Sequence, residues 1–496
     1  MKYDIVIEGA RVIDPAQNID RVTNVAVADG KIAAVGDEID AADAARRIDA
    51  SGKFLSPGWI DMHVHTYSHL AFSHPDTIGV LHGVTTVVDA GGAGAWTYDD
   101  CRRYWEGRTK TDIYALPLYN AAGIYLGDRG VLDQEPNQSL QVPLDDWLDM
   151  VDRNRDRVRM IKSATVTRLG FRPVEAARAI ADKVGLPMYM HIGDQRGESG
   201  FRDVLRSPGP IITKEVLDTM RPGDCVTHTY TGNRGGLLGE DGEVLPELYA
   251  ARKRGVWLDV GYGGLNFDWA VFDKLLAADV VTDAIDTDLQ GVNVTGPVHS
   301  LAHVMSIFLN HGLTVSELVE RVTINPARIL RLEDRMGSLT PGYPARATVF
   351  DIEEGEYEFR DHKGVKRTGS RMIAPAFCVM DGEVIESDFE PSLEQSNWSF
   401  MPLMADDDLS MLEGRLDEEQ REFARALGRD YADVAWDEGH DLHKAFKRRV
   451  TAMGIDEVHA VDGVFDLFME NRFLVPVGWL LKTFDKETAV ERLLSA

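Results

Sequence analysis

Cysteine is scarce in this sequence: only Cys101, Cys225 and Cys378 occur among 496 residues. An odd number at wide spacing fits neither a disulfide framework nor a cysteine metal site, and it favours a reducing cytoplasm. Long apolar runs are missing too, since none approaches the roughly 20 residues that cross a bilayer. The N-terminal MKYDIVIEGARVIDP does not contain the apolar stretch of a signal peptide. We therefore expect a cytoplasmic protein without a membrane partner.

Basic residues are few relative to acidic ones. Lysine and arginine number 53 against 81 aspartates and glutamates, and the formal net charge is −28. Nucleic acid and anionic membrane surfaces are poor partners for such a chain. Apolar residues make up 44%, aromatic residues 8% and charged residues 27%, as in ordinary globular proteins. A length of 496 residues exceeds one ordinary core, so more than one domain is expected.

Both flanks of a long central region are rich in strand signals. Asp29-Gly30 separates two apolar runs within residues 24–36, which indicates a β-hairpin. The same signal returns far away as Asp381-Gly382, after the strand-like residues 347–359. We predict one small discontinuous sheet domain made of residues 1–55 and 340–390.

The central residues 56–339 alternate strand-like and helix-like segments. The strand candidates are GWIDMHVH, TTVVDAG, DIYALPLYN, VRMIKSATV, PMYMHIGD, CVTHTYTG, VWLDVGYG and DAIDTDLQ. Residues 173–185 read as one of the helices between them, opening on Pro173 and ending near Gly185. Eight such repeats predict an α/β fold of the closed (β/α)8 TIM-type barrel class. An open doubly wound sheet is disfavoured because no glycine-rich phosphate turn follows the first strand.

The C-terminal residues 391–496 differ from the rest of the chain. Phe423, Leu427, Tyr431 and Val434 recur at helical spacing, and the apolar residues 473–484 need a surface to cover them. We predict a helical appendage that packs either on the barrel or on another subunit. A homo-oligomer is therefore expected.

Polar side chains stand at the ends of several predicted barrel strands. They are His63, His65, Lys162, His191, His228, Asp286 and Asp288. Barrel active sites lie at the C-terminal ends of the strands, so these residues are expected to converge on one mouth. Each residue alone would more often be an ordinary core or surface residue, and their joint placement is what favours a site.

The chemistry of this set is that of a two-metal centre. Imidazole and carboxylate bind zinc-like ions, and two adjacent ions make a bridging water nucleophilic. The pair His63 and His65 would hold one ion, and the pair His191 and His228 the other. An anion must offset the repulsion of two dications. Burial favours the neutral amine of Lys162, which could add carbon dioxide and become a carbamate.

The motifs FLSPGWIDMHVH, HGVTTVVDAG, RMIKSA, MHIGD, THTYTGN, GPVHSLAHVMS and ERVTINPARIL resemble the amidohydrolase superfamily of metal-dependent hydrolases, in its dihydroorotase-like deacetylase branch. The resemblance covers about residues 1–390 and implies a barrel with a β-sandwich built from both flanks. It also implies two divalent ions, zinc first among them, bridged by a carbamate on Lys162 and held by the two histidine pairs.

The resemblance also assigns the proton-transfer group. A hydroxide held between the ions would attack the substrate carbonyl, with Asp288 as metal ligand and as general acid and base. Asp286 stands where the superfamily more often has a small residue. Both aspartates could face the barrel interior, because they are two apart on a strand, so alternation alone does not choose between them.

Residues in the loops after the strands would contact a small-molecule substrate. The candidates are Tyr119, Asn120, Arg168, Tyr230 and Asn233. The branch resemblance favours hydrolysis of an acyl amide or ester, as in a deacetylase. A cyclic-amide hydrolase of the dihydroorotase or hydantoinase kind is the alternative. A catalytically silent scaffold is disfavoured because all six ligand positions are intact.

Overall fold

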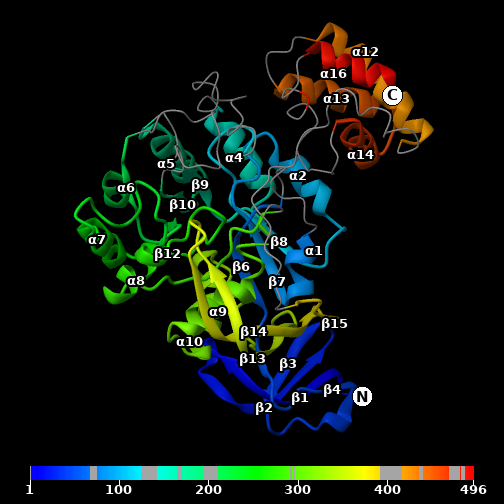
Figure 1. The fold of residues 1–496 in the computed structure, drawn as a ribbon. Helices are drawn as coiled ribbons and strands as arrows, with labels where there is room; N and C mark the ends of the chain where they lie inside the picture. The colour runs from blue at the N-terminus through cyan, green and yellow to red at the C-terminus, as the bar shows by residue number, and fades with distance from the viewer. Residues whose placement is uncertain are drawn as a thin grey trace.

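The computed structural model describes residues 2–66, 75–123, 142–164, 170–193, 210–290, 293–294, 296–390, 416–434, 439–468, 481 and 486–496. These residues form a sheet domain at the N-terminal end, a central barrel and a group of C-terminal helices (Figure 1). The chain is an α/β protein with a TIM-type barrel and a β-sandwich domain, as the sequence predicts.

The sandwich domain is built from one sheet to which both flanks of the chain contribute. Its strands are β1 (Tyr3–Asp14), β2 (Ile19–Ala28), β3 (Lys31–Gly36), β4 (Ala44–Asp49), β5 (Phe54–Pro57), β13 (Arg346–Arg360), β14 (Lys366–Met380) and β15 (Glu383–Glu386). Their order is β15-β14-β13-β5-β1-β2-β3, with β4 also paired to β1. Strands β5 and β13 are antiparallel, with Leu55 opposite Val349, so this pairing joins the two flanks in one sheet.

The two predicted hairpin turns are confirmed. Asp29 and Gly30 connect β2 to β3 with φ of 52° and 68°, and Asp381 and Gly382 connect β14 to β15 with φ of 51° and 92°. Two consecutive positive φ values suit the right-handed twist of the flanking strands, and aspartate followed by glycine adopts them readily.

Parallel strands form the wall of the barrel. They are β6 (Trp59–Val64), β7 (Val84–Asp89), β8 (Asp112–Ala115), β9 (Ile161–Ala164), β10 (Met188–His191), β11 (Cys225–Thr227) and β12 (Trp257–Leu258). Strands β6, β7 and β8 make one sheet, and β9 to β12 make a second. Isolated bridges from Ala115 to Val158 and from Leu118 to Lys162 join the two sheets on one side.

The eighth predicted strand closes the other side with single bonds in place of a regular ladder. The amide of Asp283 donates to the Leu258 carbonyl over 2.8 Å. Beyond it, the Asp288 amide donates to the His63 carbonyl over 2.6 Å, and the His65 amide donates to the Leu289 carbonyl over 2.9 Å. The end of the eighth segment therefore lies beside the end of the first strand.

Helices cover the outside of the barrel (Figure 1). They are α1 (Pro75–Ile78), α2 (Tyr98–Trp105), α4 (Leu144–Arg153), α5 (Arg172–Val184), α6 (Thr213–Thr219), α7 (Pro246–Arg254), α8 (Trp269–Ala277), α9 (Leu301–Asn310), α10 (Val315–Val322) and α11 (Ile324–Ile329). The predicted helix at 173–185 is confirmed as α5, which ends where Gly185 takes φ of 74°. None of the described helices is both long and apolar enough to cross a membrane.

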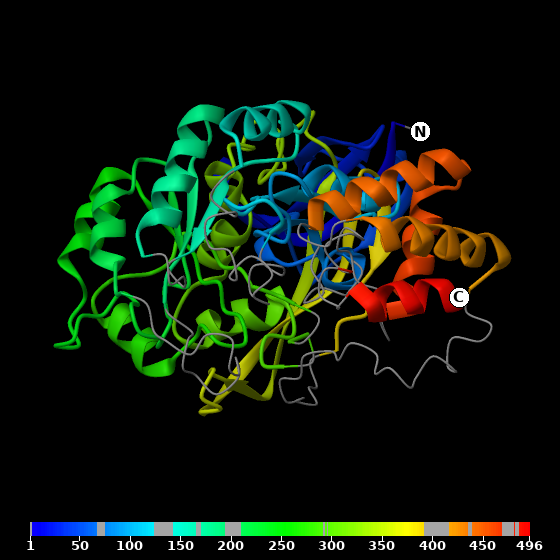
Figure 2. The same cartoon turned by 90° about the horizontal axis from the view of Figure 1, so that it is seen from above.

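The C-terminal extension is helical. Its helices are α12 (Glu418–Asp433), α13 (Gly439–Met453), α14 (Glu457–Phe468) and α16 (Lys486–Ser495). Phe423, Leu427 and Tyr431 of α12 are buried in one cluster with Leu442 and Phe446 of α13. Seen from above, the extension lies on the side of the molecule opposite α6, α7 and α8 (Figure 2).

The extension contacts the barrel of its own chain. Ala122, in the loop after β8, is buried in the same apolar cluster as the helices of the extension, and Trp96 after β7 packs against that cluster. The two barrel loops are joined to each other, since the Trp96 amide donates to the Ala121 carbonyl over 2.9 Å. Of the predicted apolar run 473–484, only Leu481 is described, and it is fully buried. The homo-oligomer stays a prediction.

Ion pairs reinforce this contact between the extension and α2. Lys447 Nζ of α13 lies 2.7 Å from Asp100 Oδ1, and Arg103 Nη1 lies 2.7 Å from Glu457 Oε2 of α14. Lys447 also pairs with Glu457. These side chains are partly shielded from water, with Lys447 29% and Asp100 17% exposed, so their attraction is screened less than that of a fully exposed pair.

Reversing the charge of Lys447 tests this interface. Lys447→Glu places a third carboxylate beside Asp100 and Glu457, and we expect a loss of about 1–3 kcal/mol in the free energy of unfolding. Arg448→Glu makes the same charge change at an exposed neighbouring position of α13 and is expected to change stability by less than about 0.5 kcal/mol. Thermal and denaturant unfolding measure both. Equal effects of the two variants would contradict the docking role of Lys447.

Candidate metal and catalytic site

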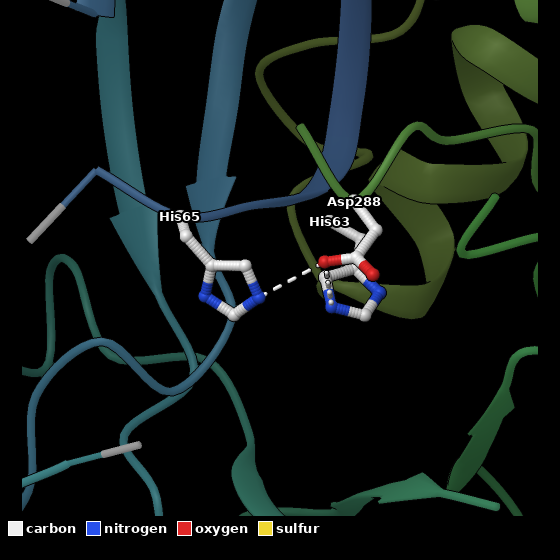
Figure 3. A group of neighbouring side chains, drawn as sticks. All are labelled: His63, His65 and Asp288. Atoms are coloured by element: carbon white, nitrogen blue, oxygen red, sulfur yellow. Dashed lines mark ion pairs between the residues drawn. The ribbon is translucent and has the colours of Figure 1, made fainter. Parts of the chain in front are cut away.

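Two histidines of the first barrel strand and one aspartate of the eighth segment meet at the barrel mouth. Asp288 Oδ1 lies 3.0 Å from His65 Nε2 and 3.5 Å from His63 Nε2. Figure 3 shows both imidazoles directed at the same carboxylate oxygen. All three residues are buried, and each offers an atom within 4.8 Å of the others in a group that could hold a metal ion.

Lys162 of β9 enters the same cluster. Its Nζ lies 3.1 Å from His63 Nε2 and donates to the Ala90 carbonyl over 2.5 Å. The side chain is fully buried. Gly91 leaves room for it: a Cβ at that position would lie 2.8 Å from Lys162 Cδ, and the backbone there has φ of +97°. Glycine is therefore required beside the lysine by both space and conformation.

His191 and His228 form a second imidazole pair. His228 Nε2 lies 2.9 Å from His191 Nδ1, and the ring centroids of His63 and His228 are 5.1 Å apart. His228 Nδ1 lies 2.7 Å from the Gly261 carbonyl. A carbonyl only accepts, so Nδ1 carries the proton and the Nε2 lone pair faces the cluster. The six predicted ligand residues therefore lie in one group.

Burial keeps these imidazoles neutral. It lowers the pKa of His63 and His191 well below the ordinary range and lowers the pKa of His228 to about 4. The nearby charge of Lys162 acts in the same direction on all three. Neutral imidazole is the form that binds cations, so the cluster is prepared for metal ligation at neutral pH.

Asp288 is ionised in this setting. Burial raises the pKa of its carboxyl, but the hydrogen bond from His65 and the nearby charges of His65, His228 and Lys162 outweigh burial, and the net pKa is lowered. Its oxygens have further partners, since Gln290 Nε2 donates to Oδ1 over 3.2 Å and Asn266 Nδ2 lies 3.5 Å from Oδ2. The carboxylate is therefore both charged and held in orientation.

Asp286 has different surroundings, although it is only two positions away. Its Oδ1 accepts from the Gly261 amide over 2.6 Å, and its Oδ2 is a buried oxygen without a hydrogen-bond partner. Burial, followed by the charges of Asp259 and Asp61, raises the pKa of Asp286 well above the ordinary range. Burial also raises the pKa of Asp259 to about 6. A carboxyl held neutral below the mouth is a poor proton acceptor, which favours Asp288 as the base.

Two of the predicted substrate contacts form hydrogen bonds within the protein, and their contact with a substrate stays a prediction. Asn120 Oδ1 accepts from the Ala122 and Gly123 amides over 3.1 and 2.6 Å, and Nδ2 donates to the Gly123 carbonyl over 3.2 Å. The Tyr230 hydroxyl accepts from the Thr282 amide over 3.3 Å. Asn120 therefore closes its own turn, and Tyr230 anchors the segment before the eighth strand. Both side chains thus have a structural role within the described residues.

The other three predicted substrate contacts, Asn233, Tyr119 and Arg168, differ in where they lie. Asn233 Nδ2 donates to the Leu265 carbonyl over 2.9 Å and lies 3.3 Å from Asn266 Oδ1, so it links the loop after β11 to a residue that contacts Asp288. The Tyr119 amide donates to the Lys162 carbonyl over 2.9 Å. Arg168 lies outside the described residues.

Gln290 and Asn266 hold the Asp288 carboxylate and are not among the site residues predicted from the sequence. Both follow predicted barrel strands and so stand at the same mouth as the ligands. A polar residue two positions after the aspartate was the available signal for Gln290. Asn266 is separated from β12 by a longer loop and had no comparable signal.

Comparison with known proteins identifies the family. A model of the amidohydrolase family matches residues 242–385. Deacetylase Atu3266 of Agrobacterium fabrum is 32% identical over 364 residues, which are 72% of this chain and 85% of that protein. The chain belongs to the amidohydrolase family. A deacetylase of Brucella anthropi is 30% identical over 379 residues, which are 74% of this chain and 89% of that protein.

Solved structures of amidohydrolases have the same fold. A crystal structure of an adenine deaminase superposes with a TM-score of 0.69 and 27% identity over 78% of this chain and 100% of that one. A dihydroorotase superposes with a TM-score of 0.66 and 30% identity over 78% and 99%. Each of these structures covers 78% of this amidohydrolase. The remaining fifth of the chain is about the size of the C-terminal extension. The chain is a metal-dependent hydrolase of this family.

The two aspartates can be distinguished by substitution. Asp288→Asn removes the ionised carboxylate, and we expect kcat for hydrolysis to fall by about 10²–10⁴-fold, with most of the metal retained through the histidines. Asp286→Asn replaces a neutral acid by a neutral amide of the same shape and should lower kcat by less than about tenfold. Steady-state kinetics and metal analysis of both variants decide the matter. A larger loss in Asp286→Asn would identify that residue as the base.

Proposed function

We propose that this amidohydrolase is a deacetylase-type enzyme that hydrolyses an acyl amide or acyl ester of a small molecule with two divalent metal ions, zinc first among them. The observation that carries the proposal is one buried cluster of four histidines, one lysine and one ionised aspartate at the barrel mouth. Two relatives named deacetylase, matched over 85% and 89% of their own lengths, support the choice of reaction.

The donor set suits divalent ions. His191 Nε2 is a buried ring nitrogen without a hydrogen-bond partner. Buried polar atoms are seldom left unpaired, and a metal ion is a natural partner for a neutral imidazole. His63, His65 and Asp288 would hold one ion, with His191 and His228 on the other. This assignment uses every residue of the cluster except Lys162.

Lys162 would supply the anion between the two ions. Its amine is enclosed by histidines and lies 3.1 Å from His63 Nε2, a position that disfavours an ammonium beside cations. A neutral amine adds carbon dioxide to give a carbamate and one released proton. The carbamate carries one negative charge at the end of a long side chain, which suits a ligand shared by two dications.

The reaction then rests on a few groups. Bound in the cluster, the two ions would supply an activated water and polarise the substrate carbonyl. Asp288 accepts the proton of the attacking water and passes it to the leaving amine or alcohol. Gln290 and Asn266 hold the Asp288 oxygens during this transfer. The bond from His228 Nδ1 to the Gly261 carbonyl keeps the His228 lone pair directed into the site.

A cyclic-amide hydrolase is the second candidate. The specific support is the dihydroorotase structure, which is 30% identical to this chain and superposes over 99% of its own length. Both candidates use the same cluster and differ in the pocket around it.

We further propose that the protein acts in the cytoplasm as a homo-oligomer, without nucleic-acid or membrane partners. Its three free, buried cysteines support a reducing compartment.

A substrate panel separates the two candidates. We expect an N-acetyl amino acid or an acetylated hydroxy acid to be hydrolysed with a kcat/KM at least 100-fold above that for a hydantoin, because a pocket fitted to one leaving group rejects another by such factors (about 2–3 kcal/mol). Acetate release and ring opening are the readouts, and Asp288→Asn is the control for contaminating activity. Faster turnover of the hydantoin would select the cyclic-amide hydrolase.

Metal content tests the role of Lys162. The wild type should contain about two ions per chain after supply of zinc, and Lys162→Ala should lose most of the metal and activity. Short carboxylic acids, added without bicarbonate, should restore part of both by replacing the missing anion. Lys183→Ala, on the outer helix α5 with its side chain 37% exposed, is the matched control. Wild-type metal and activity in Lys162→Ala would exclude the carbamate.

A further inference from the structure

The imidazole of His63 has a second polar edge, which faces away from the proposed metals. Its Nε2 is directed at Lys162 and Asp288, whereas its Nδ1 lies 2.9 Å from the Tyr189 hydroxyl and 3.0 Å from the Thr227 hydroxyl. Both hydroxyls are fully buried. Two buried hydroxyls that converge on one ring nitrogen form an arrangement that the ligand set does not itself require.

The direction of these hydrogen bonds follows from the chemistry of the ring. If Nε2 binds a cation, Nδ1 must carry the proton of the neutral imidazole. Nδ1–H then donates to the hydroxyls, which accept and are left with protons of their own to donate. A buried hydroxyl proton without an acceptor is costly, so an acceptor is required below Tyr189 and Thr227.

We assign that role to Asp259. Its carboxyl is close enough to the side chains of Thr227 and Tyr189 for both of them to lower its pKa against the effect of burial. It is fully buried and directly follows β12, next to the strand that ends with Thr227. Asp286 lies near the same carboxyl, whose charge raises the pKa of Asp286. Tyr189 and Thr227 therefore contact His63 and also act on Asp259.

The position of Tyr189 adds a second contact with the site. Its ring meets the His63 ring edge-on at a centroid distance of 5.4 Å, and Lys162 Nζ lies 5.8 Å from its centroid. Tyr189 is two residues before His191 on β10, so both side chains face the barrel interior. The tyrosine belongs to the layer of side chains directly beneath the proposed ligands.

We propose that Asp259 is a positioning residue that acts through the hydroxyls of Tyr189 and Thr227 to hold His63 in the tautomer and orientation of a metal ligand. The inference rests on the proposed function, because it takes His63 as a ligand. Partners of this kind fix the ring and raise its basicity, and their loss typically weakens metal binding or activity by about 10–100-fold.

Removal of the hydroxyls tests the relay without removing bulk. Tyr189→Phe and Thr227→Val each leave one hydroxyl on Nδ1, and each should weaken metal binding by less than about tenfold. The variant that combines Tyr189→Phe with Thr227→Val should bind the more tightly held of the two zinc ions about 10–100-fold more weakly. Asp259→Asn should weaken zinc binding by the same factor. Affinity is measured on metal-free protein by competition with a chromophoric zinc chelator, which does not depend on catalysis.

Three further measurements separate positioning from general stability. Tyr431→Phe removes the hydroxyl of an equally buried tyrosine in the extension, which donates to the Leu442 carbonyl over 2.8 Å; it should lower the melting temperature but keep wild-type affinity. Thr227→Ser restores a hydroxyl and should recover the affinity lost in Thr227→Val. Excess zinc should restore most of kcat in the double variant with KM unchanged.

The outcomes distinguish the inference from the proposed function. A wild type that takes up two zinc ions and a double variant with unchanged affinity would overturn the relay alone and leave the proposed function in place. A wild type that binds no zinc would overturn both. Weakened binding in the double variant and in Asp259→Asn, with Tyr431→Phe unaffected, supports the relay.

Discussion

Two backbone hydrogen bonds between the first barrel strand and the eighth segment determine where the chemistry of this protein can occur. The Asp288 amide bonds to the His63 carbonyl, and the His65 amide bonds to the Leu289 carbonyl. These bonds bring groups more than 220 positions apart to within 3.5 Å of one another. Asp61 adds a side-chain link, since its Oδ2 accepts from the Thr287 hydroxyl over 2.6 Å. Closure of the barrel and assembly of the site are therefore one event.

The cluster carries an electrostatic cost that the fold must offset. Four histidines and a lysine are buried beside one ionised carboxylate, and two more acids lie beneath them. The chain limits the cost by holding His63, His191 and His228 neutral, by surrounding Asp288 with donors and by raising the pKa of Asp259 and Asp286. A site arranged in this way is poorly satisfied when empty and well satisfied when cations are present.

Much of this arrangement is predictable from the sequence, and the reasons are local. Alternation along GWIDMHVH directs His63 and His65 to one side, and the rule that barrel sites lie at strand C-termini brings Lys162, His191 and His228 to them. The six residues lie together as predicted, while their role as metal ligands stays a prediction. The hairpin turns and the helix at 173–185 are equally local and equally predictable.

The remaining features depend on tertiary contacts that no sequence pattern records. Asn120 looks like a loop residue available to substrate, but its amide is used by the turn that it begins. Asp286 and Asp288 are equivalent by alternation, and only Gly261 and Asp259 on one side and His65 on the other distinguish them. Docking of the extension relies on Trp96 and Ala122, small parts of two barrel loops that carry no special pattern.

The discontinuous sheet has a consequence for synthesis of the chain. Trp59, just after β5, bonds to Thr348 of β13, 289 positions later, so the N-terminal strands emerge long before their partner. Until β13 arrives, the edge of β5 is unpaired and open to contact with other chains. Closing so large a loop is slow, and the nascent protein must keep its first domain half-built while the whole barrel is made. Refolding yield after dilution from denaturant is thereby coupled to protein concentration, more strongly than for a barrel whose sheet domain is contiguous.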